Sequence, residues 1–118
     1  MTGRRELIYR AIENVVRNAI RFTAEDTNVE IKTASSQDGT RKMAVVQVSD
    51  HGPGIPEQEI ESIFRPFYRV DPARSAQTGG FGVGLAIADR AIRLHKGDVR
   101  AFNRNGGGLT IEMRLPQA

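Results

Sequence analysis

An amide pair, an acidic residue in a glycine turn and a glycine-rich loop follow one another along this chain. Asn14 and Asn18 are one helical turn apart, residues 50–54 read Asp-His-Gly-Pro-Gly, and residues 80–84 read Gly-Phe-Gly-Val-Gly. An amide oxygen is a hard, neutral ligand suited to Mg²⁺. A carboxylate can accept a hydrogen bond from the exocyclic amine of adenine, and glycine N–H groups can surround phosphates. Together and in this order, the three groups predict a binding site for ATP.

Each group also has a simpler interpretation when it is taken alone. On a helix, Asn14, Asn18 and Arg21 fall within about 60° of one another, at the edge of an apolar stripe where a helix would line a pocket. Arg21 could then reach phosphates, but the same residues could also be solvated on a helix surface. Asp50 could belong to an ordinary turn after a strand. A calcium loop is disfavoured because no further carboxylates follow Asp50 at the offsets that such a loop requires.

The glycines at 80–84 run directly into an expected helix, whose N–H groups and dipole favour phosphate. A dinucleotide-binding motif is excluded because no strand precedes these glycines and their spacing differs; a flexible linker is the alternative. His51 and His95 could in principle accept a phosphoryl group, but their places in a glycine turn and near a helix end favour solvated or capping roles. No Ser–His–Asp set or metal cluster is visible.

The composition indicates a single globular domain. The chain has 118 residues, of which 39% are hydrophobic and 26% charged, with a net charge of +3. The absence of cysteine excludes disulfides and thiolate metal sites. Nucleic-acid binding is disfavoured because the arginines are spread along the chain and aromatic residues make up only 6%. No apolar run approaches the about 18 residues of a membrane span.

Apolar periodicity and turn residues predict the elements that must position these groups. Helices are expected over about 5–22, 57–64 and 83–96, with Pro56 at the start of the second and Gly97 as the stop of the third. The strands are expected in two hairpins, over 29–33 and 43–49 with a turn at Asp38-Gly39, and over 98–103 and 109–115 with a turn at Gly106-Gly107-Gly108.

The order of these elements predicts the fold and a long loop. Residues 65–84 show no periodicity, and a loop of this length is typical of a functional lid or a disordered segment. The expected architecture is an α/β (α+β) two-layer sandwich with a mainly antiparallel, mixed sheet and helices on one face.

The motifs resemble those of the ATP-binding catalytic domain of bacterial sensor histidine kinases, in the superfamily of gyrase, Hsp90 and MutL. Residues 13–23 look like the N box of that family, 50–54 like its first glycine box, 64–69 like its F box and 80–84 like its second glycine box. The resemblance covers nearly the whole chain and implies a Bergerat-type ATP-binding fold. Among subgroups, the chain is most similar to the Cpx-type envelope-stress kinases.

The resemblance implies a role for each matching residue. Asn14 and Asn18 would hold Mg²⁺, Asp50 would bind the adenine amine, and Phe22 would pack against the adenine or ribose. Catalytic roles would fall to Asn18, Arg21 and Arg69, with the two arginines at the phosphates. The implied nucleotide-binding residues are Asn14, Asn18, Arg21, Phe22, Asp50, Gly52, Gly54, Ile55, Gly80, Gly82, Val83, Gly84 and Leu85.

The resemblance also implies a kinase domain that acts on another domain. It would bind ATP with Mg²⁺ and donate the γ-phosphoryl group to a histidine of a dimerisation domain. A response regulator would be an indirect partner. The chain would be one cytoplasmic domain, 1–118, of a larger kinase anchored in the bacterial inner membrane, with no membrane contact of its own. It would show no appreciable autokinase activity alone.

Two departures and two alternatives accompany this interpretation. Phe81 and Val83 stand where the family commonly has Thr and Leu, and the short strands that usually precede the first helix are absent, so a sheet edge is expected to be missing. One alternative is an anti-sigma switch kinase that phosphorylates a serine on an anti-anti-sigma partner, which the box formed by Phe64 and Phe67 disfavours. The other is a degenerate, nucleotide-free interaction module.

Overall fold

The computed structural model describes residues 2–66, 68 and 84–117 of the chain. The elements in chain order are α1 (Thr2–Phe22), β1 (Glu30–Asp38), β2 (Arg41–Ser49), the 3₁₀ helix η1 (Glu57–Phe64), α3 (Gly84–Leu94), β3 (Asp98–Asn103) and β4 (Leu109–Pro116). The expected helices and hairpins are therefore all present.

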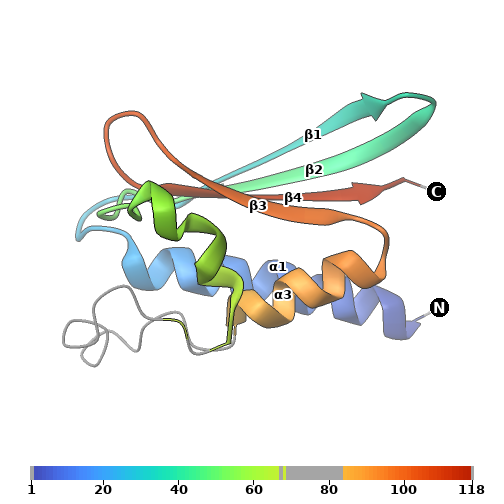
Figure 1. Cartoon of the computed structure of the whole chain (residues 1–118), viewed down its shortest axis with the longest axis horizontal. Helices are drawn as coiled ribbons and strands as arrows, with labels where there is room; N and C mark the ends of the chain where they lie inside the picture. The colour runs from blue at the N-terminus through green and yellow to red at the C-terminus, as the bar shows by residue number, and fades with distance from the viewer. Residues whose placement is uncertain (1, 67, 69–83, 118) are drawn as a thin grey trace.

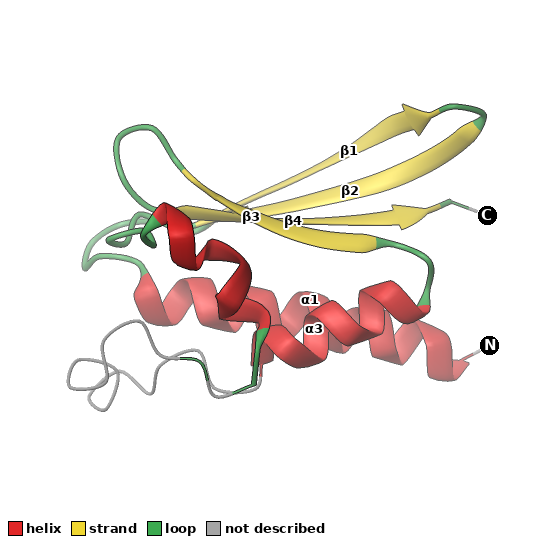
Figure 2. Cartoon of the chain, in the orientation of Figure 1, coloured by secondary structure: helices red, strands yellow, loops and turns green. Residues whose placement is uncertain are grey.

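The four strands form one sheet in the order β1-β2-β4-β3, and each neighbouring pair is antiparallel. Helices α1 and α3 run side by side in opposite directions across one face of this sheet, and η1 fills the space at one end (Figure 1). Figure 2 shows the same arrangement as a layer of strands above a layer of helices. The predicted α/β two-layer sandwich is confirmed.

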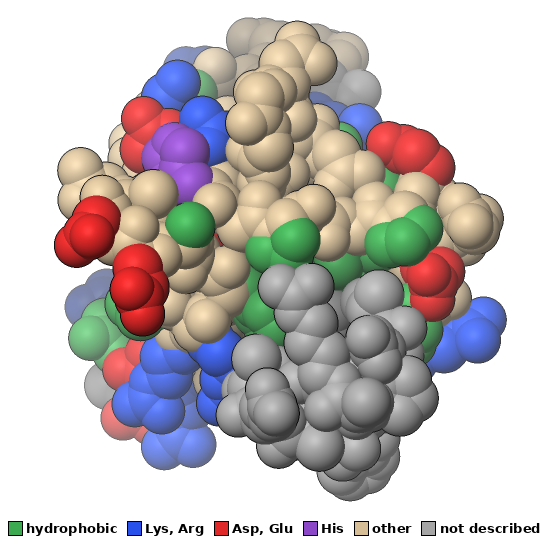
Figure 3. Space-filling view, turned by 90° about the vertical axis from the view of Figure 1, so that its left-hand side faces the viewer, with side chains coloured by type: hydrophobic (Ala, Val, Ile, Leu, Met, Phe, Trp, Pro, Cys, Tyr) green, Lys and Arg blue, Asp and Glu red, His purple; other side chains and the backbone are tan. Residues whose placement is uncertain are grey.

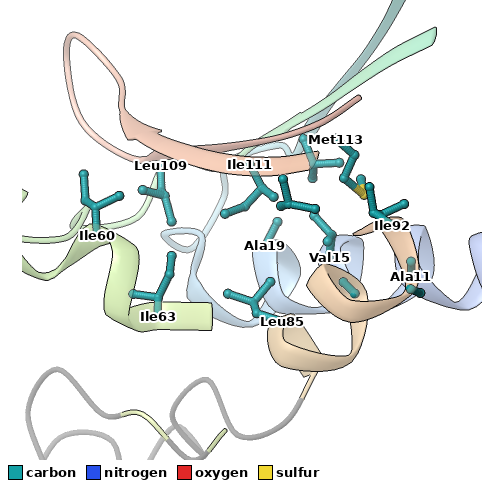
Figure 4. Close-up of a cluster of buried hydrophobic side chains, with 14 of the residues drawn as sticks. Ala11, Val15, Ala19, Ile60, Ile63, Leu85, Ile92, Leu109, Ile111 and Met113 are labelled. Carbon is teal, nitrogen blue, oxygen red and sulfur yellow. The ribbon is translucent and has the colours of Figure 1, made fainter. Parts of the chain in front are cut away.

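The core lies between the two layers and is built from regularly spaced apolar residues. On α1, Ala11, Val15 and Ala19 recur every four residues, which places them on one face of the helix. On β4, Leu109, Ile111 and Met113 alternate with side chains that point away from the helices. Figure 4 shows these two sets meeting Leu85 and Ile92 of α3, together with the two isoleucines of η1.

The end of α3 differs from the expectation. Gly97 was expected to stop the helix, but Lys96 is the residue with positive φ, at 65°. The N–H of Lys96 donates to the Arg93 carbonyl and that of Gly97 to the Ile92 carbonyl, both at 3.0 Å, which is the Schellman pattern. Gly97 is still required, because a Cβ there would overlap the carbonyl oxygen of Arg114 on β4.

The expected helix over 57–64 is a 3₁₀ helix that follows Pro56. In a 3₁₀ helix, residues three positions apart lie above one another. Ile60 and Ile63 therefore both face the core, where they are buried. Across the part of the chain that the structure describes, no helix is long and apolar enough to cross a membrane.

Candidate functional site

The end of α1 and the loop that follows β2 are in direct contact. A Cβ added at Gly52 would overlap the carbonyl oxygen of Phe22, so only glycine allows this approach. Beside it, the N–H of His51 donates to the Thr23 hydroxyl oxygen at 3.0 Å. The structure thus brings together the amide-bearing helix and the acid–glycine turn, which are more than twenty residues apart in the sequence.

The Asp50 side chain is buried, with an exposed fraction of only 4%, and its backbone and carboxylate are held by hydrogen bonds. Its N–H donates to the Leu109 carbonyl at 3.0 Å. Its Oδ1 accepts the N–H of Gly52 at 2.8 Å and the N–H of Leu109 at 3.2 Å. Among the described residues, hydrogen bonds reach only this oxygen of the carboxylate. The other oxygen, Oδ2, keeps its capacity to accept.

The two asparagines lie along α1, between the part of the helix that contacts this turn and the part that contacts α3. Asn18 is buried, with 8% of its surface exposed, and Asn14 is half-buried. A Cβ added at Gly84, the first residue of α3, would lie 3.8 Å from the Cβ of Asn14. Asn14 and Asn18 are about 6 Å apart along the helix axis, and Asn18 and Phe22 are separated by the same rise. Asn18 therefore lies between the contact with α3 and the contact with the Asp50 turn.

Figure 1 shows the end of α1, the loop after β2 and the turn between β3 and β4 gathered at one end of the molecule. Figure 3 looks onto this end, where hydrophobic side chains reach the surface at the centre and acidic and basic side chains lie toward the rim. The expected site residues of α1 and of the loop after β2 thus meet at this end, beside the turn of the second hairpin.

The remaining expected site residues differ in their surroundings. Arg21 is exposed, and Phe22 is half-buried against the core. Ile55 and Leu85, expected to contact the nucleotide, have their side chains buried in the hydrophobic core. The other four expected residues lie outside the described residues: Arg69, Gly80, Gly82 and Val83.

Asn103, at the end of β3, was not singled out by the sequence. Its Oδ1 accepts the N–H of Ile55 at 2.9 Å and its Nδ2 donates to the Ile55 carbonyl at 2.6 Å. Gly54 adopts a φ of 76°, and a Cβ there would lie 2.7 Å from the same Oδ1. Asn103 thus fixes the glycine turn from the sheet side. Its place directly before the turn of the second hairpin was the only signal in the sequence.

The F box contributes a tyrosine that links two segments of the chain. The Tyr68 hydroxyl donates to the Glu59 carboxylate on η1. Partial burial of the ring and this carboxylate together raise the pKa of Tyr68 to about 12, because ionisation would place a second negative charge next to the first. This bond ties the start of the long loop to η1.

Among the residues that the structure describes, each histidine has a backbone carbonyl as its hydrogen-bond partner. The Nδ1 of His51 lies 2.7 Å from the Asn28 carbonyl oxygen, and that of His95 lies 2.7 Å from the Ala91 carbonyl oxygen in the last turn of α3. Both rings thus bind backbone, as the solvated or capping interpretation expected. Within residues 2–66, 68 and 84–117, no group of three or more His, Asp or Glu side chains could hold a metal ion.

The donor set fits a nucleotide with a bound divalent cation. Asn18 is a buried, neutral oxygen donor on the helix, and amide oxygens of this kind suit Mg²⁺ when phosphate oxygens and water complete the shell. Asp50 is a buried acceptor with one oxygen unengaged by the described residues. An amine of a bound base could therefore donate to Asp50, and a phosphate-bound cation could be held by Asn18.

Comparison with known proteins decides the family. The family model of histidine kinase-, DNA gyrase B- and HSP90-like ATPases matches residues 3–118. The chain belongs to this family. It is 44% identical over 106 residues to the sensor histidine kinase CpxA of Escherichia coli K12, which covers 90% of this chain and 22% of that protein. It is 36% identical over 109 residues to the sensor histidine kinase WalK of Bacillus subtilis 168, covering 92% and 18%.

Solved structures give the same result. The catalytic domain of the histidine kinase ThkA, in a nucleotide-free form, has a TM-score of 0.70 and 34% identity over 95% of this chain and 68% of that one. Full-length ShkA in complex with AMPPNP has a TM-score of 0.73 and 28% identity over 93% and 21%. The expected resemblance to sensor histidine kinases, including the Cpx type, is confirmed. The chain spans about a fifth of the length of the curated relatives CpxA and WalK.

Proposed function

We propose that this chain is the catalytic domain of a sensor histidine kinase, which binds ATP with Mg²⁺ and donates the γ-phosphoryl group to a histidine on a separate dimerisation domain. Family membership and the similarity to named sensor histidine kinases support this proposal. On this proposal, residues 1–118 are one domain of a longer, membrane-anchored kinase, its catalytic side lies in the cytoplasm, and a response regulator receives the phosphoryl group from the histidine.

The observation that carries the proposal is the state of the Asp50 carboxylate. Two backbone N–H groups hold Oδ1 and fix the direction of the side chain, and only 4% of the Asp50 surface is exposed. A fixed acceptor selects a ligand that donates in one direction. The 6-amino group of adenine fits this requirement, whereas the 6-carbonyl of guanine would oppose one acceptor with another.

The phosphate end of the nucleotide would lie toward α1. Asn18 and Asn14 would hold Mg²⁺, and Arg21 and Arg69 would contact the phosphates. Mg²⁺, when bound, neutralises the negative charge that phosphoryl transfer must redistribute. The chain's own contribution is then to hold the nucleotide and to exclude water, with Gly80, Gly82 and Gly84 allowing the backbone to approach the phosphates and Gly52 keeping the base close to the turn.

The acceptor histidine belongs to the dimerisation domain, so the chain alone should not label itself. The test is incubation with γ-³²P-ATP and Mg²⁺, with and without a separately prepared phosphoacceptor domain of a Cpx-type kinase. We expect acid-labile label on the acceptor domain and none on this chain, in line with the capping roles of His51 and His95. Label on either of these histidines, or label on a serine of any partner, would contradict the proposal.

A further inference from the structure

The first residue after β3, Arg104, reaches across the end of the sheet to the Asp50 turn. Its Nη1 donates to the Asp50 carbonyl oxygen at 2.9 Å, and its Nη2 lies 3.2 Å from Oε2 of Glu30, the first residue of β1. Its own N–H closes the second hairpin by donating to the Gly108 carbonyl at 2.9 Å. One side chain thus connects the second hairpin, the start of β1 and the acid that the proposed function assigns to adenine.

The peptide group between Asp50 and His51 is held at both of its ends. Arg104 binds its carbonyl oxygen, and the Thr23 hydroxyl, just beyond α1, accepts its N–H at 3.0 Å. The preceding peptide is held because the Asp50 N–H donates to Leu109. Both backbone dihedral angles of Asp50 are therefore restrained, and with them the direction in which the carboxylate leaves the backbone.

The ion pair with Glu30 does not explain the position of Arg104. The Glu30 side chain is 47% exposed and that of Arg104 24% exposed. Surface ion pairs of this kind contribute little to stability because solvent screens them and their side chains lose entropy. A charged donor on a buried backbone carbonyl is the stronger interaction of the two.

We infer that Arg104 is a positioning residue, which sets the orientation of the Asp50 carboxylate through the 50–51 peptide and so contributes to the selection of adenine. The inference rests on the proposed function. Arg104 does not touch the nucleotide in this account; it acts only through the backbone of Asp50. Its loss should therefore weaken recognition of the adenine amine more than it weakens binding of the rest of the nucleotide.

The test compares two nucleotides on four forms of the 118-residue chain: the parent, Arg104→Met, Arg104→Lys and Glu30→Gln. The nucleotides are ATP and purine riboside triphosphate, which lacks the 6-amino group. For Arg104→Met we expect the Kd of ATP to rise about tenfold, with the Kd of purine riboside triphosphate changed less than about twofold. Arg104→Lys, which keeps one charged donor, should recover part of the selectivity. Glu30→Gln, which removes only the ion pair, should match the parent.

Equal loss of both nucleotides in Arg104→Met would overturn the inference, because a purely structural role would not discriminate between them. Unchanged selectivity would overturn it as well. If Arg104→Met loses its folded circular-dichroism signal, Arg104→Lys decides between the same outcomes. A parent chain that binds neither nucleotide would refute the proposed function itself, so the two failures are distinguishable.

Discussion

Replacing Asp50 by Asn tests the adenine assignment with a change of one atom. The Asn side chain can still present an oxygen to the N–H groups of Gly52 and Leu109, which now lie 2.8 Å and 3.2 Å from Oδ1. That orientation leaves an NH₂ group at the position of Oδ2, facing the adenine amine. The opposite orientation would place the NH₂ group against two N–H donors, so the side chain has no arrangement that satisfies every partner.

The expected magnitudes follow from these contacts. Hydrogen bonds to the neutral Asn oxygen are weaker than those to a carboxylate, so the free energy of unfolding should fall by about 1–2 kcal/mol. Binding loses a charge-assisted hydrogen bond and leaves two donors facing each other, which costs about 3 kcal/mol. The Kd for ATP should therefore rise about a hundredfold.

The assay is calorimetric titration with ATP and Mg²⁺, accompanied by urea denaturation of the same samples. Asp98→Asn is a matched control, because Asp98 lies at the start of β3, about 16 Å along the strand from Asn103. This control changes the net charge equally and should leave the affinity within about twofold. A folded Asp50→Asn chain that binds ATP within about threefold of the parent would refute the adenine assignment.

Three further predictions concern other parts of the site. Asn18→Ala should abolish the Mg²⁺-dependent part of nucleotide binding while circular dichroism shows a folded chain; unchanged affinity would count against the metal role. Gly52→Ala should lower the free energy of unfolding by about 1–3 kcal/mol, since the added Cβ would overlap the backbone carbonyl of Phe22. Gly84→Ala is the control and should not lower it, because its Cβ would lie at an ordinary 3.8 Å from the Cβ of Asn14. Equal melting temperatures for these two variants would disprove the contact between Gly52 and Phe22. Because folding raises the pKa of Tyr68 from 10.0 to about 12, the stability due to its neutral form is complete below pH 10 and lost as pH rises toward 12. Tyr68→Phe should flatten this loss in urea denaturation across that range; an unchanged slope would contradict it.

Local patterns predicted the elements because each pattern depends on neighbours in the sequence. The spacing of Ala11, Val15 and Ala19 specifies the buried face of α1 whatever packs on it. The turn at Gly39, with a φ of 63°, follows from the same local chemistry. The order of motifs then indicated which residues share a site, and the contact of Gly52 with Phe22 is consistent with that expectation.

The parts that could not be predicted depend on register between distant strands. The N–H of Leu109 can donate to the Asp50 carboxylate only because β4 lies beside β2, where Ser49 pairs with Thr110. Asn103 reaches Ile55 for a similar reason, since β3 lies on the other side of β4. No spacing in the sequence encodes these neighbours. The positive φ of Lys96 was missed because the adjacent glycine offered the lower steric cost.

The most direct test of the account is calorimetric titration of the unaltered chain with ATP, with and without Mg²⁺, and with GTP. We predict one site per chain, binding that strengthens when Mg²⁺ is present, and a clear preference for ATP over GTP. A folded chain that binds no ATP, or that binds GTP equally well, would contradict the claim that Asp50 and the α1 asparagines form a single adenine-nucleotide site.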